Sequence, residues 1–403
     1  MTTAGHVIFR RFWTTLAFGG AVGEWALWCW FFGAPSSVVA HALCLAGLFA
    51  MNRLAAEAFD RETHRAPLLS PVGGVVLGLG FMAFGGAAAL GLAAAGWLVL
   101  DMLIAFPAEA GALVGPAGAH LGPGFELVAP FIIAAASGTV GYGYLVGHSR
   151  LRVTQLDVPI EGLPSALDGL RVVHISDLHL GPLAHLASLR AAFDRVAALE
   201  PDIVCLTGDI VDSPKADLDH WGPEMARLTA RYGVFAILGN HDRVAGGDAV
   251  AAMIARHTSW ELLRDRVASV TIDGAQLHVI GIEDRLVPQT PRVLSALRAE
   301  VPAGEPCILL IHQPGGFTLT SSSGIPLTLA GHTHGGQVAA PGVPKLNPAR
   351  LLMTRFDGGT FERDGVVMHV NRGLGVSGQR IRVGVPREIT VVTLRTHAAV
   401  KAA

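Results

Sequence analysis

Hydrophobic residues follow two different patterns along this chain. In the first 150 residues they form long apolar runs separated by short polar segments. Membrane-spanning helices have this pattern, because each needs about 20 apolar residues to cross the hydrocarbon core. From residue 171 onward, short apolar runs alternate with stretches of helical spacing. The pattern predicts two regions of different architecture.

Four apolar segments in the N-terminal half are predicted to be transmembrane helices. They cover residues 12–32, 36–51, 68–106 and 127–146. The third is long and rich in glycine and alanine, as tightly packed membrane helices often are, and is expected to form one tilted helix. The sequence therefore predicts an N-terminal bundle of about four spans.

The distribution of basic residues predicts the orientation of these spans. Arg10 and Arg11 precede the first span, three arginines separate the second from the third, and Arg150 and Arg152 follow the fourth. The other two loops contain no lysine or arginine. The positive-inside rule then predicts a multi-pass protein of the cell (inner) membrane, with both termini and the C-terminal half in the cytoplasm. An export signal at Arg10-Arg11 is the alternative, but no small-residue cleavage site follows it.

The C-terminal half alternates predicted strands with predicted helices. The strands cover residues 172–175, 202–206, 234–238, 269–272, 276–282, 307–311 and 327–330, and the helices cover 187–199, 223–232, 249–256 and 291–299. Residues 359–394 alternate apolar and polar positions, which predicts antiparallel strands. This order indicates an α/β domain of layered sheets with helices outside. The predicted boundaries are a transmembrane region at 1–150, a linker at 151–168 and the α/β domain at 169–397.

Composition agrees with a chain that is partly in lipid. The 403 residues are 51% hydrophobic and 15% charged, whereas soluble domains carry about 25% charged residues. The net charge of −2 gives no indication of specific nucleic-acid binding. Two of the four cysteines lie in apolar N-terminal segments and two in predicted core strands, which is not a disulfide framework.

Acidic, histidine and asparagine side chains gather where the predicted strands end. In open α/β sheets, ligands bind at the carboxyl ends of the strands. A single such residue is ordinarily structural, but a group at successive strand ends predicts a site for Mn, Fe, Zn or Mg ions. The group contains no cysteine, which argues against a structural zinc site. Its members are Asp177, His179, Asp209, Asn240, His241, Asp242, His312, His332 and His334.

Five motifs formed by these residues resemble the signature of the calcineurin-like metallophosphoesterases. They are Asp177-Leu-His179, Gly208-Asp209, Gly239-Asn240-His241-Asp242, His312 and Gly331-His332-Thr-His334. The resemblance covers about residues 165–397, and the preceding hydrophobic helices resemble the membrane-associated bacterial YkuE-like branch. It implies a four-layer α/β/β/α sandwich and a metal-dependent phosphoesterase.

The resemblance also implies a role for each motif residue. Asp177, His179 and His334 would hold the first of two divalent metal ions; Asn240, His312 and His332 would hold the second; and Asp209 would bridge them. His241 would face the substrate, oriented by Asp242. Two cations about 3.5–4 Å apart clamp a phosphoryl group, and a hydroxide between them attacks phosphorus. Arg243 and Asn371-Arg372-Gly373 are further candidates for contacts at the site.

Three functional hypotheses follow. The first is a membrane-anchored binuclear-metal phosphohydrolase that cleaves a phosphoester, with a phosphodiester favoured and a lipid-linked substrate suggested by the membrane half; its partners are that substrate and the lipid bilayer. The second is a cytoplasm-facing nucleotide phosphodiesterase with the helices as a simple anchor. The third is a membrane transport or scaffold protein with a regulatory phosphoesterase module, although the spans have few of the polar groups that a transport path needs.

Overall fold

The computed structural model describes residues 37–50, 123–214, 216–284, 290–340, 343–378 and 380–396, together with Ala21 and Trp25. The chain divides into two compact units, residues 1–144 and 145–403. The fourth predicted span lies on the helix α4 (Pro123–Leu145), and residues 38–50 of the second are helical. Of the helices in the described residues, none combines the length and apolar character needed to cross a membrane. The third predicted span, and nearly all of the first, lie outside the described residues.

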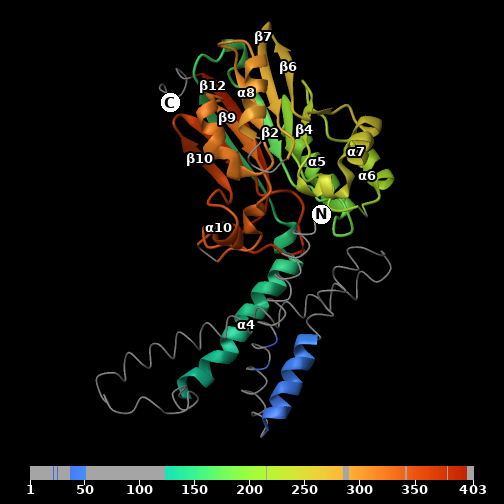
Figure 1. Cartoon of the computed structure of the whole chain (residues 1–403), viewed down its shortest axis with the longest axis vertical. Coiled ribbons are helices and arrows are strands. Elements are labelled where there is room, and N and C mark those ends of the chain that lie inside the picture. The colour runs from blue at the N-terminus through green and yellow to red at the C-terminus, as the bar shows by residue number, and fades with distance from the viewer. Residues whose placement is uncertain are drawn as a thin grey trace, which may run out of the picture. The chain divides into compact units, whose positions relative to one another are not determined.

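Two six-stranded sheets form the framework of the second unit (Figure 1). The strands of the first sheet, in spatial order, are β1 (Leu151–Ile160), β12 (Arg387–Thr396), β2 (Arg171–Ile175), β3 (Ile203–Thr207), β4 (Val234–Ile237) and β5 (Glu261–Leu262). Those of the second are β10 (Gly359–Arg363), β11 (Val366–Val370), β9 (Leu327–Ala330), β8 (Cys307–Leu310), β7 (Ala275–Gly281) and β6 (Arg266–Ile272). The helices are α5 (Leu186–Ala197), α6 (Leu218–Met225), α7 (Asn240–His257), α8 (Thr290–Glu300), α9 (Phe317–Thr320) and α10 (Pro348–Leu352).

Parallel pairing brings the ends of several strands to one edge of each sheet. Strands β2 to β5 are parallel to one another, as are β7, β8, β9 and β11. The prediction of antiparallel strands in the tail holds for β10 with β11 and for β12 with β2. It is wrong for the other two pairs, because β11 runs parallel to β9 and β12 runs parallel to β1. Alternation reports which face of a strand is buried, whereas the direction of its neighbour depends on the path of the whole chain.

The stretch predicted as a linker is part of the first sheet. Strand β1 pairs with β12 along its whole length, from Leu151 to Ile160. Val158 and Ile160, near its end, are buried, whereas most of the strand is half-buried or exposed. This partial exposure is what an edge strand has, and its many polar side chains made the segment resemble a linker.

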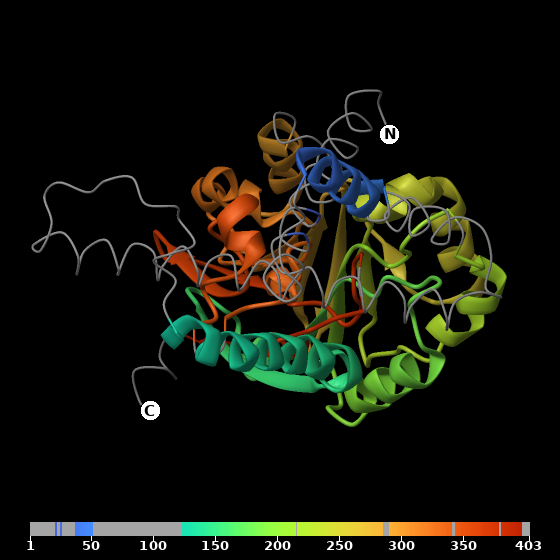
Figure 2. The ribbon, with the colours of Figure 1, turned by 90° about the horizontal axis from the view of Figure 1, so that it is seen from below.

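Three clusters of buried apolar side chains produce a four-layer arrangement. One joins the first sheet to α5, α6 and α7. A second lies between the two sheets and includes Cys205 and Ile237 from one and Leu277 and Leu310 from the other. The third joins the second sheet to α8 and α9. Figure 2 shows the green-to-yellow helices and the orange helices on opposite sides of the strands. The order of layers is therefore helix, sheet, sheet, helix.

A substitution at Phe193 tests how much the packing of helix α5 on the first sheet stabilises the domain. It lies on α5, is 2% exposed and packs in the cluster under the first sheet. Truncating a buried phenylalanine removes apolar contacts and leaves a cavity, so Phe193→Ala is expected to lower the free energy of unfolding by about 3–5 kcal/mol. Urea denaturation of the full chain measures this. The control Arg195→Ala, at an exposed position of the same helix, is expected to leave the free energy of unfolding unchanged within experimental error.

Candidate metal centre

The loops that follow five strands bring the predicted residues together. These strands are β2, β3, β4, β8 and β9, and each is followed directly by one of the motifs. In the described part of the chain, histidine and aspartate side chains form three groups in which the donor atoms lie within 4.8 Å of one another. The first group is Asp177, His179 and His334, and the second is Asp209, His312 and His332. A third grouping joins His179 and His241 to Asp212, which the sequence analysis did not single out.

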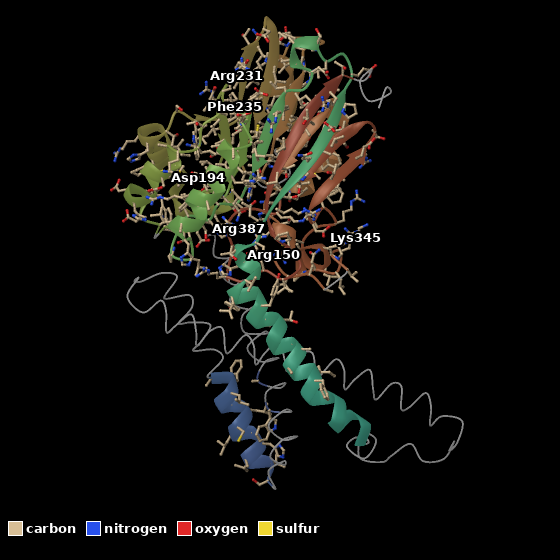
Figure 3. The ribbon with its side chains drawn as sticks, turned by 180° about the vertical axis from the view of Figure 1, so that it is seen from behind. Arg150, Asp194, Arg231, Phe235, Lys345 and Arg387 are labelled. Carbon is tan, nitrogen blue, oxygen red and sulfur yellow. The ribbon has the colours of Figure 1, made fainter. Side chains whose placement is uncertain are left out.

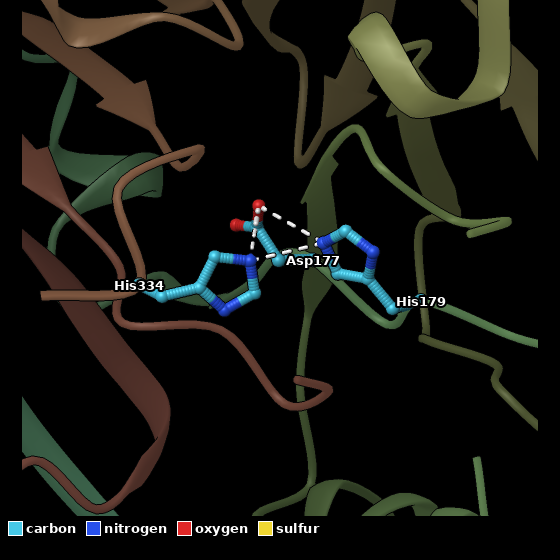
Figure 4. A group of neighbouring side chains, drawn as sticks. All are labelled: Asp177, His179 and His334. Atoms are coloured by element: carbon cyan, nitrogen blue, oxygen red, sulfur yellow. Dashed lines mark hydrogen bonds and ion pairs between the residues drawn. The ribbon is translucent and has the colours of Figure 1, made fainter. Parts of the chain in front are cut away.

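The first group is buried and its donor atoms point toward one another (Figure 4). His179 Nε2 lies 2.9 Å from His334 Nε2 and 3.9 Å from Asp177 Oδ1. His334 Nε2 lies 3.5 Å from the same carboxylate oxygen. Two imidazole nitrogens and a carboxylate oxygen that converge in a buried space form a donor set suited to a divalent cation.

The second group has the same chemistry with an added amide oxygen. His312 Nε2 lies 3.2 Å from Asp209 Oδ2, 3.2 Å from His332 Nδ1 and 3.0 Å from Asn240 Oδ1. The predicted set Asn240, His312 and His332 is thus gathered around one point. Asp209 joins the two groups, because the same oxygen lies 3.6 Å from His179 Nε2.

Hydrogen bonds on the outer side of two rings direct their other nitrogen inward. His312 Nδ1 donates to the Thr207 carbonyl at 2.7 Å. His179 Nδ1 donates to Asp212 Oδ1 at 2.9 Å. When Nδ1 carries the proton of a neutral ring, the lone pair is on Nε2, which is the form that binds a metal. Both Nε2 atoms face the donor groups described above, so the rings fit a cation.

The backbone of these loops has an unusual conformation. Five of the predicted ligands have a positive φ between 47° and 73°. Residues other than glycine rarely adopt this region, and such conformations cluster at functional sites. The loops also approach one another closely, because a Cβ on Gly239 would collide with Asp209 Oδ1. The five residues are Asp177, His179, Asp209, His332 and His334.

The pKa values of Asp209, His312 and His332 are shifted by burial and by their mutual charges. Burial alone would raise the pKa of Asp209, but the charge of His312 holds it well below its usual range. Burial alone would lower the pKa of His312, but Asp209 raises it to about 10. Burial and the charge of His312 lower the pKa of His332 to about 3. A proton on His312 therefore occupies the position where a cation would lie, and metal binding must displace it.

Comparison with known proteins decides the family. The model of the calcineurin-like phosphoesterase family matches residues 170–336. The metallophosphoesterase YkuE of Bacillus subtilis is 29% identical over 66% of this chain and 94% of its own length. The second unit is a calcineurin-like metallophosphoesterase domain. The chain is accordingly a metal-dependent phosphoesterase, as the resemblance implied.

Two further relatives of this phosphoesterase have informative names. A "transmembrane protein with metallophosphoesterase domain" of Danio rerio is 29% identical over 63% of this chain and 60% of its own length. The UDP-2,3-diacylglucosamine pyrophosphatase LpxG of Chlamydia trachomatis is 26% identical over 60% of this chain and 88% of its own length.

The phosphoesterase differs from the sequence prediction in which aspartate serves His241. The prediction that Asp242 orients the His241 ring is wrong, because the Asp242 carboxylate accepts hydrogen bonds from the backbone N–H groups of Gly239, Ile210 and Val211. Burial, and then the charge of Asp209, raise the pKa of Asp242 to about 7. Its bonds fix the start of α7 against the loop after β3. Asp242 thus positions the backbone of the motif.

Asp212, and not Asp242, lies beside the His241 ring. His241 Nδ1 donates to the Asp212 carbonyl at 2.8 Å, and Asp212 Oδ1 lies 3.6 Å from the same nitrogen. The same carboxylate holds His179. The available signal in the sequence is its position three residues after Asp209, which a short loop would keep near the strand end.

The remaining candidates are the segment Asn371-Arg372-Gly373 and the side chain of Arg243. Gly373, with a φ of 77°, lies where a Cβ would come within 2.9 Å of Asp177 Cβ, so the segment Asn371-Arg372-Gly373 does return to the site. The Arg372 side chain, however, pairs with Glu388 at 2.9 Å. Arg243 is more than half exposed and lies 3.9 Å from Asp284.

Asp212 provides a test of the metal centre. Outer-shell partners of metal ligands typically contribute 10–100-fold to metal affinity. Asp212→Ala is therefore expected to raise the Mn²⁺ concentration for half-maximal activity by about 10–100-fold, because His179 loses the group that orients it. A metal titration of hydrolysis measures the change. Asp219→Ala, at an exposed position on α6, is the matched control.

Proposed function

We propose that this chain is a membrane-anchored phosphohydrolase with two divalent cations, which cleaves a phosphoester, and preferably a phosphodiester, of a lipid-linked substrate. The observation that carries the proposal is the position of Asp209, whose single oxygen Oδ2 faces a histidine from each of the two donor groups. One carboxylate between two cation sites offsets the repulsion between the ions.

The proposal gives each ligand a task. Asp177, His179 and His334 hold one cation and Asn240, His312 and His332 hold the other, with Asp209 shared. When bound, the cations polarise the phosphoryl oxygens and lower the pKa of a bound water. The chain's own part is to fix the donors, which the outer hydrogen bonds of His179 and His312 do, and to bury all of them except the half-buried Asn240 and His332.

His241 is proposed to supply the proton for the leaving group. Its side chain is about one-third exposed, so a substrate can reach it. Its Nδ1 is fixed by the Asp212 carbonyl, which leaves Nε2 to carry a proton toward the departing oxygen. Imidazole is the side chain that enzymes use most often for proton transfer.

Four observations support a lipid-linked substrate at a membrane. The apolar segments of the first 150 residues support anchoring, and the arginines that flank them support a catalytic unit on the cytoplasmic side. The name of LpxG describes a pyrophosphatase that acts on UDP-2,3-diacylglucosamine, a sugar nucleotide with two acyl chains, and so supports a lipid-linked phosphate compound as substrate. The name of the Danio rerio relative describes a transmembrane protein.

Hydrolysis by the full chain in detergent micelles tests the proposal. The protein is stripped of metal and then given Mn, Fe, Zn or Mg in turn, with an aryl phosphodiester, an aryl phosphomonoester, nucleoside phosphodiesters and an acylated sugar nucleotide as substrates. The expected result is metal-dependent hydrolysis with the acylated substrate preferred over its deacylated counterpart. Equal rates on the two would support the nucleotide phosphodiesterase instead. Failure with every metal would overturn the proposal.

A further inference from the structure

An exposed apolar segment lies between the last metal-centre motif and strand β10. Four large apolar side chains between residues 343 and 353 are at least half exposed, an unusual density for a protein surface in water. They are Val343 (52%), Leu346 (51%), Leu351 (67%) and Met353 (56%). We call residues 343–355 the apolar–basic segment.

The same segment is positively charged. It contains Lys345, Arg350 and Arg355 and no acidic residue. Arg350 is partly neutralised by Asp357 at 2.9 Å, and Arg355 lies over the Phe356 ring at 4.8 Å. Lys345 forms no ion pair among the residues that the structure describes and is exposed. Apolar side chains interleaved with basic residues, one of them a lysine that is unpaired among the described residues, are typical of a surface that enters the headgroup region of an anionic bilayer.

A basic cavity opens behind this segment. Its volume is about 490 Å³, which is enough for a phosphate-bearing headgroup. Four cationic side chains line it, against two carboxylates, Asp357 and Glu388. The cations are Arg152, Lys345, Arg350 and Arg372. Gly335, in the loop that carries His334, forms part of the wall, so the cavity adjoins the back of the metal centre.

The segment lies at the end of the α/β unit where the chain enters it. Figure 3 shows Lys345, Arg150 and Arg387 near one end and Arg231 toward the other. The unit begins at Leu145, only five residues before Arg150. Five extended residues span less than about 18 Å, so this basic end of the unit follows closely along the chain on the apolar segments predicted to cross a membrane.

We propose that the apolar–basic segment docks the catalytic unit on an anionic lipid surface, with a lipid headgroup phosphate in the cavity behind it. A bilayer fits better than a folded protein partner, because the apolar side chains are dispersed among cations along one short segment. A protein interface would instead concentrate its apolar contacts in a core with charges at the rim. The docking uses the membrane association of the proposed function but does not depend on hydrolysis.

Lipid-borne quenching of a fluorescent probe tests the docking. In the full chain with Cys29→Ser and Cys44→Ser, a polarity-sensitive probe is attached at Leu351→Cys; the other two cysteines are buried. The protein is reconstituted into liposomes of phosphatidylcholine alone or with phosphatidylglycerol, each containing a headgroup-level quencher. Quenching is expected to be several-fold stronger at this position than at Arg231→Cys, and stronger with the anionic lipid. Lys345→Glu is expected to weaken the binding of the segment at least about fivefold, the factor that one basic residue near an anionic surface contributes.

Matched variants make the outcome decisive. Arg231→Glu changes the charge equally at an exposed site away from the segment and is expected to leave quenching unchanged. Equal quenching of the probes at 351 and 231 in both lipid mixtures would overturn the docking, as would a Lys345→Glu effect matched by Arg231→Glu. Because the readout is fluorescence, loss of docking is distinguishable from loss of hydrolysis. Docking without any hydrolysis would leave this inference standing and overturn the function proposed above.

Discussion

Asp209→Asn is expected to lower kcat/KM for phosphoester hydrolysis by on the order of 10³-fold or more, at saturating metal. The carboxylate is buried, and its Oδ2 faces His179 on one side and His312 on the other. Asparagine keeps the size and one oxygen but removes the negative charge, so two cations would repel each other without compensation. Steady-state kinetics together with metal content by elemental analysis measure the effect. The expected metal content falls below two ions per chain.

The size-matched control is Asp194→Asn. Asp194 lies on α5, is largely exposed and pairs with Arg227, so its substitution is expected to change neither rate nor metal content. A folded Asp209→Asn protein that retains two metal ions and at least a tenth of the activity would contradict the shared role of this carboxylate. Far-ultraviolet circular dichroism of the variant separates a catalytic loss from a folding loss.

His241→Ala is expected to lower kcat by about 10²–10⁴-fold for substrates with an alkyl leaving group, the usual contribution of a general acid. The loss is expected to be much smaller with a nitrophenyl leaving group, because that group departs without a proton. Metal content is expected to be unchanged, since the described contacts of the His241 ring are to Asp212 and to the edge of the His179 ring. Parallel rate measurements on alkyl and aryl phosphodiesters provide the comparison.

His220→Ala is the control for this variant, because His220 is exposed on α6 and lies away from the strand ends. The proton-donor role would be contradicted by equal losses for both leaving groups. It would also be contradicted if activity returned fully at higher metal concentration, since that result would make His241 a ligand.

The metal centre was the part of the tertiary structure most accessible from sequence. In a parallel sheet, each strand delivers the residues after it to the same edge, so Asp177 and Asp209, which follow β2 and β3, lie side by side. His312 follows β8 of the second sheet and reaches Asp209 because the two sheets pack face to face. Short uninterrupted apolar runs in the sequence predicted those strands, because a strand that is buried on both faces has few polar residues. The boundary of α7 was less accessible. It begins at Asn240, well before the predicted helix, because Asp242 holds backbone N–H groups from two loops.

By itself, the sequence determined the class of chemistry, because carboxylate, imidazole and amide side chains at successive strand ends form a ligand set for divalent cations. Tertiary structure decided which aspartate serves the His241 ring. Asp242 is its neighbour in sequence and Asp212 lies 29 residues before it, yet the folded loops place Asp212 beside the ring and direct Asp242 to backbone N–H groups. It also decided that β1 completes a sheet, because an edge strand is defined by its partner β12, more than 200 residues away. The exposure of the apolar side chains in the apolar–basic segment was likewise decided by the tertiary structure, because the packing of the whole molecule determines which side chains reach the solvent.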